Sequence, residues 1–143
     1  MIKVKPHQKQ SLLKGIKKPS SSDERHNEHL VVSFKYLDNK QGQTFEDWEK
    51  DHILAESLNT LAGYCHDTLQ NQCHTASFKP YKNFPSKENT EYDFPDHVPQ
   101  DACWASMHIN GKQCLVGHIF SNVFYVVFLD KHHRFWISKK KHT

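Results

Sequence analysis

The side chains best suited to chemistry gather in the last quarter of the chain. They are His118, His132, His133 and Arg134. Imidazole can accept or donate a proton near neutral pH because its unperturbed pKa is about 6.5, and guanidinium can bind phosphate oxygens through two parallel hydrogen bonds. Cleavage of RNA through its 2′-hydroxyl needs a base, an acid and a cation of these kinds. The four residues therefore form a candidate catalytic group, for which neither a metal nor another cofactor is expected.

Lysines beside this group could attract a polyanion. They are Lys131, Lys139, Lys140 and Lys141. Residues 1–20 also carry six lysines and no acid, whereas residues 21–130 have a net charge of −8. Two basic ends on an acidic body predict a local nucleic-acid-binding site. The alternatives are solvated terminal tails and an ordinary surface turn at Asp-Lys-His-His-Arg.

Twelve histidines raise the question of a metal site. The repeated pairs Cys65-His66 and Cys73-His74 are eight residues apart, about 12 Å on a continuous helix. Zinc sites usually bring ligands in pairs two to four residues apart, so the sequence predicts apolar thiols and surface imidazoles here. A structural zinc that uses Cys65, Cys73, Cys103 or Cys114 is the alternative.

The elements that must position these residues form an α+β pattern. Thr44 and Asp47 form a capping-box pair that begins a predicted helix reaching about residue 65, and a short second helix is predicted at 67–73. Alternating or continuous apolar residues predict the strands, with Asn110-Gly111 as a hairpin turn. The predicted strands are 29–37, 103–109, 113–120, 123–130 and 134–138. The predicted fold is thus an N-terminal strand, a helix or helical hairpin, and an antiparallel four-stranded meander.

The length of 143 residues fits one domain, and an aromatic share of 12% indicates that the chain folds. Residues 1–28 are predicted to be a flexible basic arm, and residues 29–143 a single domain. Four prolines interrupt 78–100, which is predicted to be an extended insert without regular structure. No long apolar run predicts a membrane segment or secretory signal, and the four cysteines fit reduced thiols, so a cytoplasmic location is expected.

Part of this pattern resembles known families. The block at 115–136, together with the strand at 29–37, resembles a family of small uncharacterised bacterial proteins found in mobile genetic regions, which implies no activity. More distantly, the order of strand, helical hairpin and meander with a basic end is similar to the RelE/HigB-like toxins. Arg134 lies where the last strands of those toxins bring cationic residues, although the insert at 78–100 departs from their compactness.

The toxin resemblance implies cleavage of messenger RNA, often on the ribosome, and neutralisation by an antitoxin protein. The first functional hypothesis is therefore an RNA-cleaving, toxin-like ribonuclease of a toxin–antitoxin or phage-related system. The second is a non-enzymatic binding protein, an inhibitor or adaptor that holds a protein or nucleic-acid partner. The two differ in whether the imidazoles and the guanidinium meet at one exposed site.

Overall fold

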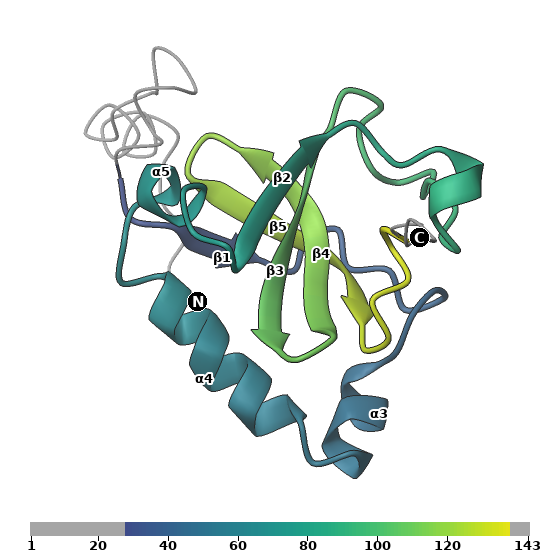
Figure 1. Ribbon diagram of the computed structural model, residues 1–143, viewed down its shortest axis with the longest axis horizontal. Helices are drawn as coiled ribbons and strands as arrows, with labels where there is room; N and C mark the ends of the chain where they lie inside the picture. The colour runs from purple at the N-terminus through teal and green to yellow at the C-terminus, as the bar shows by residue number, and fades with distance from the viewer. Residues whose placement is uncertain (1–27, 138–143) are drawn as a thin grey trace, which may run out of the picture.

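A five-stranded mixed sheet organises residues 28–137, the part of the chain that the computed structural model describes (Figure 1). The strands are β1 Val31–Ser33, β2 Phe78–Lys82, β3 Cys103–Asn110, β4 Gln113–Phe120 and β5 Val123–Asp130. They lie in the order β1-β5-β4-β3-β2, with β1 parallel to β5 and the other neighbours antiparallel. The predicted α+β class is confirmed. The predicted four-stranded antiparallel meander is not matched exactly, because the antiparallel strands are β2-β3-β4-β5 and 134–138 was predicted in place of β2.

Three helices connect β1 to β2 within residues 28–137. They are α3 Phe45–Lys50, α4 Leu54–Tyr64 and α5 Leu69–Gln72, and a 3₁₀ turn, η1, follows later at Lys87–Asn89. The capping box is formed, because the Thr44 side chain accepts from the Asp47 backbone and the Asp47 carboxylate accepts from the Thr44 backbone. The predicted long helix is broken between α3 and α4, where His52 takes a left-handed φ of 61°. None of these helices has the length and apolar character needed to cross a membrane.

The predicted final strand at 134–138 does not form over its described residues, 134–137. The edge of β5 that such a strand would need is already occupied. β1 pairs with the first three residues of β5, and the backbone N–H groups of Asp38 and Gln43 donate to the carbonyls of Val127 and Leu129. The backbone N–H groups of Arg134 and Phe135 instead donate to the Asp130 carboxylate, both at 2.9 Å. A carboxylate that binds two consecutive N–H groups turns the chain away from a strand ladder, and Phe135 enters the core.

The proline-rich segment does contain regular structure, contrary to the prediction for 78–100. Its first residues form β2, which carries Pro80 opposite Ala105 of β3. Proline cannot donate to a ladder, but β2 is an edge strand, where one missing donor is tolerated. The rest of the segment runs from η1 back to β3.

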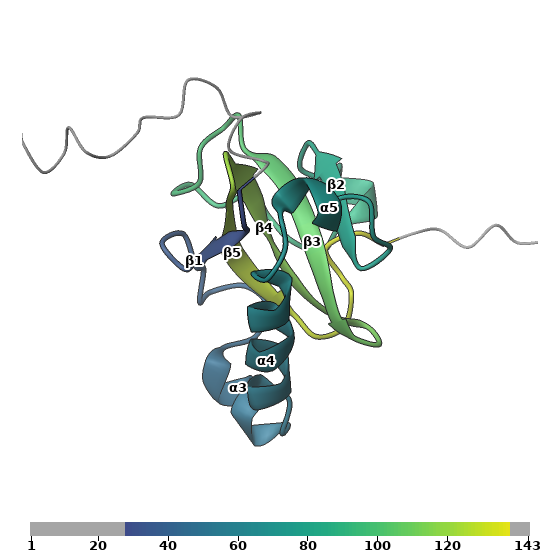
Figure 2. The same ribbon diagram turned by 90° about the vertical axis from the view of Figure 1, so that its left-hand side faces the viewer.

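The sheet has a core on each face. On one face, the helices bury apolar residues that include Trp48, Leu61 and Leu69 against Phe124 and Leu129 of the sheet. On the other, a second core is formed by Tyr92, Val98, Trp104, Val116, Val127, Phe128 and Phe135. Figure 1 shows α4 and α5 on one side of the sheet and the β2–β3 connection, with η1, on the other. Figure 2 shows α3 and α4 packed together beyond one end of the strands.

The predicted basic arm, 1–28, lies outside the described residues except for Glu28. Lys139, Lys140 and Lys141, predicted to bind nucleic acid, also lie outside them. The candidate residues that the structure describes therefore all lie in the folded body, residues 28–137.

Candidate functional site

The candidate catalytic residues lie at two ends of β4. His118 is in the last third of β4 and pairs with Tyr125, whereas the turn that carries His132, His133 and Arg134 follows β5, whose last residue pairs with Cys114. His118 and Cys114 are four residues apart on one strand, a separation of about 13 Å at the usual rise. A general base must lie within hydrogen-bonding reach of the proton that it removes. The structure therefore does not bring His118 together with the other three residues.

The turn after β5 brings only two of the predicted residues into one hollow. His132 and Arg134 line a shallow depression of about 330 Å³, shared with Glu91 and Asp130. Arg134 is exposed and pairs with Glu91 at 3.4 Å. Such an exposed pair is weak, but it gives the guanidinium an acidic neighbour where a phosphate would have to bind.

Lys131 and His133 each have a different neighbour. The ammonium of Lys131 pairs with Asp51 at 2.8 Å. The imidazole of His133 lies beside that of His108, with ring centroids 5.3 Å apart. The four residues of this turn thus face different partners and do not converge on one phosphate-sized site.

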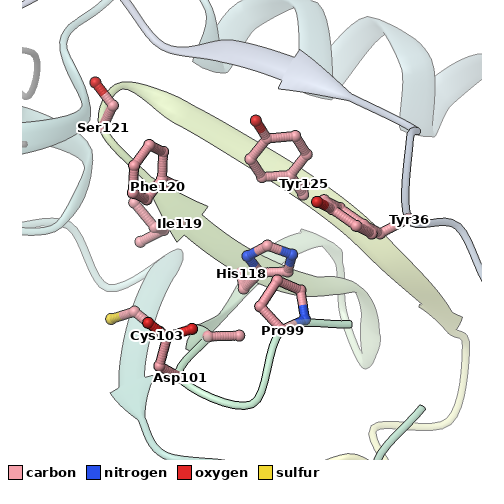
Figure 3. A pocket seen from close by; sticks show the side chains of 10 residues that line it. Tyr36, Pro99, Asp101, Cys103, His118, Ile119, Phe120, Ser121 and Tyr125 are labelled. Carbon is pink, nitrogen blue, oxygen red and sulfur yellow. The ribbon is translucent and has the colours of Figure 1, made fainter. Parts of the chain in front are cut away.

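A larger pocket lies at the other end of β4, around His118 (Figure 3). Its volume is about 540 Å³. Its walls come from the loop after β1, the approach to β3, the end of β4 and the start of β5. The lining residues are Tyr36, Pro99, Asp101, Ala102, Cys103, His118, Ile119, Phe120, Ser121 and Tyr125. We call it the His118 pocket. Apart from His118, none of these residues belongs to the predicted site.

Aromatic rings make the inner wall of the His118 pocket. The imidazole of His118 stacks on Tyr125 with ring centroids 4.9 Å apart and planes at 21°. Tyr36 closes the wall, with its ring centroid 5.1 Å from each of these two rings. Figure 3 shows the imidazole between the tyrosine pair and Pro99. A concave aromatic wall with a few polar groups is the usual form of a ligand site.

An apolar surface continues from the pocket across the sheet. Phe120 pairs with Val123, and Val123 pairs with Val31. Directly paired residues project from the same face of a sheet, so these three side chains form a row beside the pocket. Phe120 is 65% exposed and Val31 is 49% exposed. Exposed apolar side chains that adjoin a pocket are typical of a binding surface.

The His118 imidazole is neutral at physiological pH. It is 3% exposed, and burial lowers its pKa to about 4, with the Asp101 carboxylate opposing the shift. Its Nε2 atom has no hydrogen-bond partner among the described residues. A neutral imidazole is a poor proton donor near pH 7.

The comparisons with known proteins decide nothing further. No protein-family model, no curated protein and no solved structure matches the chain. The resemblance to RelE/HigB-like toxins therefore stays a prediction.

We expect His118 to make the protein less stable in mild acid. Because its folded pKa is about 4 and the unfolded value about 6.5, only the unfolded chain gains this proton as the pH falls from 6.5 to 4. Above pH 6.5 both forms are neutral and the effect vanishes. The expected loss of unfolding free energy is on the order of 2 kcal/mol at pH 4.

Urea unfolding at a series of pH values measures this effect. His118→Phe keeps a ring on Tyr125 but cannot titrate, so its stability should fall less than that of the wild type between pH 6.5 and 4. His66→Ala removes an exposed imidazole and should leave the wild-type slope. Equal slopes for all three proteins would show that His118 is not buried as described.

Proposed function

We propose that this protein is a non-enzymatic binding protein that holds a protein partner through an apolar or aromatic side chain inserted into the His118 pocket. The observation that carries the proposal is the aromatic wall of Tyr36, His118 and Tyr125 beside the exposed Phe120. Protein interfaces are commonly anchored by one such side chain in a desolvated pocket, surrounded by weaker contacts. The proposal corresponds to the second hypothesis drawn from the sequence.

The ribonuclease hypothesis draws less support from the same geometry. Its three groups would have to meet at one phosphate, yet His118 is buried and about 13 Å along β4 from the strand end near His132 and Arg134. A histidine with a pKa of about 4 is also deprotonated at neutral pH and cannot serve as the general acid there.

The charge of the described body, residues 28–137, favours a protein partner over RNA. Residues 28–137 contain nine lysines and arginines and fourteen acids, a net charge of −5, and Asp101 lines the pocket itself. An acidic body repels phosphates, whereas it attracts a basic protein surface and speeds its association. The partner segment is therefore expected to carry lysine or arginine beside its apolar anchor.

Selection from a random peptide library displayed on phage tests the proposal. The immobilised full-length protein should enrich peptides that combine an aromatic or large aliphatic residue with neighbouring basic residues. Synthetic copies of these peptides should bind Phe120→Ala at least about tenfold more weakly than the wild type, a loss of about 1.4 kcal/mol. Affinity is measured by isothermal calorimetry.

Leu58→Ala is the matched control. Leu58 is 46% exposed on α4, and this helix contacts the β3–β4 hairpin through Glu56 and Asn110, at the other end of β4 from Phe120. Peptide affinity should be unchanged in this variant. Failure to enrich any peptide that depends on Phe120 would overturn the proposal.

Single-stranded RNA provides the competing arm of the test. A fluorescent oligonucleotide that binds the wild type and loses affinity in Phe120→Ala would reassign the pocket to nucleic acid. Cleavage of that oligonucleotide by the wild type, abolished in a His132→Ala, His133→Ala double variant, would restore the ribonuclease hypothesis. Under the proposal neither occurs.

A further inference from the structure

A cluster of two imidazoles and a thiol lies toward the end of β4 opposite the His118 pocket. It is on the face of the sheet that bears the second core, around Trp104 and Phe128, which we call the loop-covered face. One side-chain ligand atom from each of His108, Cys114 and His133 lies within 4.8 Å of the other two. Cys114 is buried, and the two histidines are half-buried. All three residue types are strong ligands for zinc and other soft or borderline metal ions.

The fold positions these side chains through one hairpin pairing and one turn that follows the next strand. His108 and Cys114 are cross-strand partners in the β3–β4 hairpin, so their side chains lie on the same face. His133 comes from the turn after β5. The Asp130 carboxylate anchors this turn by accepting from the backbone N–H groups of Arg134 and Phe135. His133 itself adopts a left-handed φ of 59°, which is uncommon outside glycine and often marks a functional constraint.

One polar atom in this cluster is buried without a protein partner. Nδ1 of His108 makes no hydrogen bond within the described residues. The thiol of Cys114 has only a long contact, 3.5 Å, to the backbone oxygen of Lys112. A buried ring nitrogen without a partner is unfavourable, and such groups in native structures call for an explanation.

We propose that His108, Cys114 and His133 bind one zinc ion. Zinc–nitrogen bonds of about 2.1 Å and a zinc–sulfur bond of about 2.3 Å place tetrahedral ligand atoms about 3.5 Å apart. Small rotations of the two half-buried imidazoles close the remaining gap. On binding, the zinc–sulfur bond forms and the thiol proton passes to solvent.

Bound zinc would tie the β3–β4 hairpin to the turn after β5. That turn has no strand ladder of its own. Its links to the body include the Asp130 bonds, one bond from Lys131 N to Gln43, two bonds from Glu91 and Thr90 to the Arg134 carbonyl, two ion pairs near the surface, and the buried ring of Phe135. Three protein ligands leave a fourth position for water or for an external ligand. The proposal does not depend on the function proposed for the His118 pocket.

Cobalt substitution tests the proposal on the purified full chain after removal of metals with a chelator. Titration with Co²⁺ should give a thiolate-to-cobalt charge-transfer band that saturates at one ion per chain. Zn²⁺ should displace the cobalt, abolish the band and raise the melting temperature by about 5 °C or more. Cys114→Ser and His133→Asn should each lose the band and the shift.

Two control variants make the result specific. His132→Ala removes the exposed neighbour of His133, and Cys103→Ser removes an exposed thiol; both should keep the band and the thermal shift. Asparagine at 133 tolerates the left-handed conformation, so this variant remains informative even where Cys114→Ser fails to fold. The proposal is overturned by the absence of a one-to-one complex, or by a band that survives in His133→Asn or disappears in His132→Ala.

Discussion

Gly117→Ala is expected to destabilise the protein by at least about 3 kcal/mol. A Cβ atom at this position would overlap the backbone oxygen of Tyr125 and lie 2.7 Å from its carbonyl carbon. Both obstacles belong to the backbone of β5, so no side-chain rotation relieves them. Because β4 is central and pairs on both sides, the strands cannot move apart without loss of ladder hydrogen bonds.

The close approach at Gly117 has a structural purpose. The register between β4 and β5 shifts between Val116 and Gly117, and a bulge of this kind redirects the side chains that follow it. His118 comes next and stacks on Tyr125. Glycine at 117 thus allows the strand distortion that forms the inner wall of the His118 pocket.

Thermal and urea unfolding of Gly117→Ala measure the effect, with Gly63→Ala as the matched control. Gly63 lies in the last turn of α4, and a Cβ there would meet no atom within 4 Å. Alanine at 63 should therefore be neutral or stabilise the protein by up to about 0.5 kcal/mol. A melting temperature for Gly117→Ala within about 2 °C of the wild type would contradict the described packing.

Local signals explain which elements could be predicted from the sequence. The strands at 103–109, 113–120 and 123–130 correspond closely to β3, β4 and β5, because each carries a strong apolar pattern and short turns join them. The loop between the first two is Gly111-Lys112, one residue later than expected, with Gly111 at a φ of 57°. The Thr44–Asp47 capping box is likewise a signal contained within four residues.

Non-local pairing explains what could not be predicted. Nothing in the sequence near Val31–Ser33 indicates that this short strand pairs in parallel with the first residues of β5, or that Asp38 and Gln43 bond to the rest of the edge expected for 134–138. The pairing of β2 with β3 depends on Pro80 lying at a sheet edge, which is a property of the finished sheet. Both errors therefore arise from strand order.

In the candidate sites too, some contacts follow from local sequence signals and others depend on strand order. His108 and Cys114 flank the Asn110-Gly111 signal, so the hairpin register alone could have identified them as neighbours. Their proximity to His133 depends on the turn after β5. The aromatic wall joins Tyr36 to Tyr125 through the parallel pairing of β1 with β5, and this pairing had no signal in the sequence.

Asp130→Ala is expected to reduce the free energy of unfolding by about 3 kcal/mol or more. The carboxylate is 2% exposed and accepts from the backbone N–H groups of Arg134 and Phe135. Alanine would leave these two donors without their partner, at a cost of about 1–3 kcal/mol each when buried. Asp130→Asn retains one acceptor oxygen and should lose about half as much.

The loss should also reach the core on the loop-covered face. Phe135 lies in ring contact with Trp104, and its backbone N–H donates to the Asp130 carboxylate. Release of the turn would therefore weaken this packing, and it would also free His133 from His108 and Cys114. Near-ultraviolet circular dichroism reports on Trp104, and the cobalt band reports on His133.

Asp51→Asn separates this anchoring role from a general effect of charge. Asp51 binds the same turn, but from the surface, through an exposed pair with Lys131, and exposed pairs contribute only about 0–1 kcal/mol. Its loss should leave the melting temperature, the tryptophan signal and the cobalt band near their wild-type values. If Asp130→Ala behaves like Asp51→Asn, the turn is held by contacts other than the buried carboxylate. If only Asp130→Ala loses all three, a single acid both prevents the predicted last strand and positions the third zinc ligand.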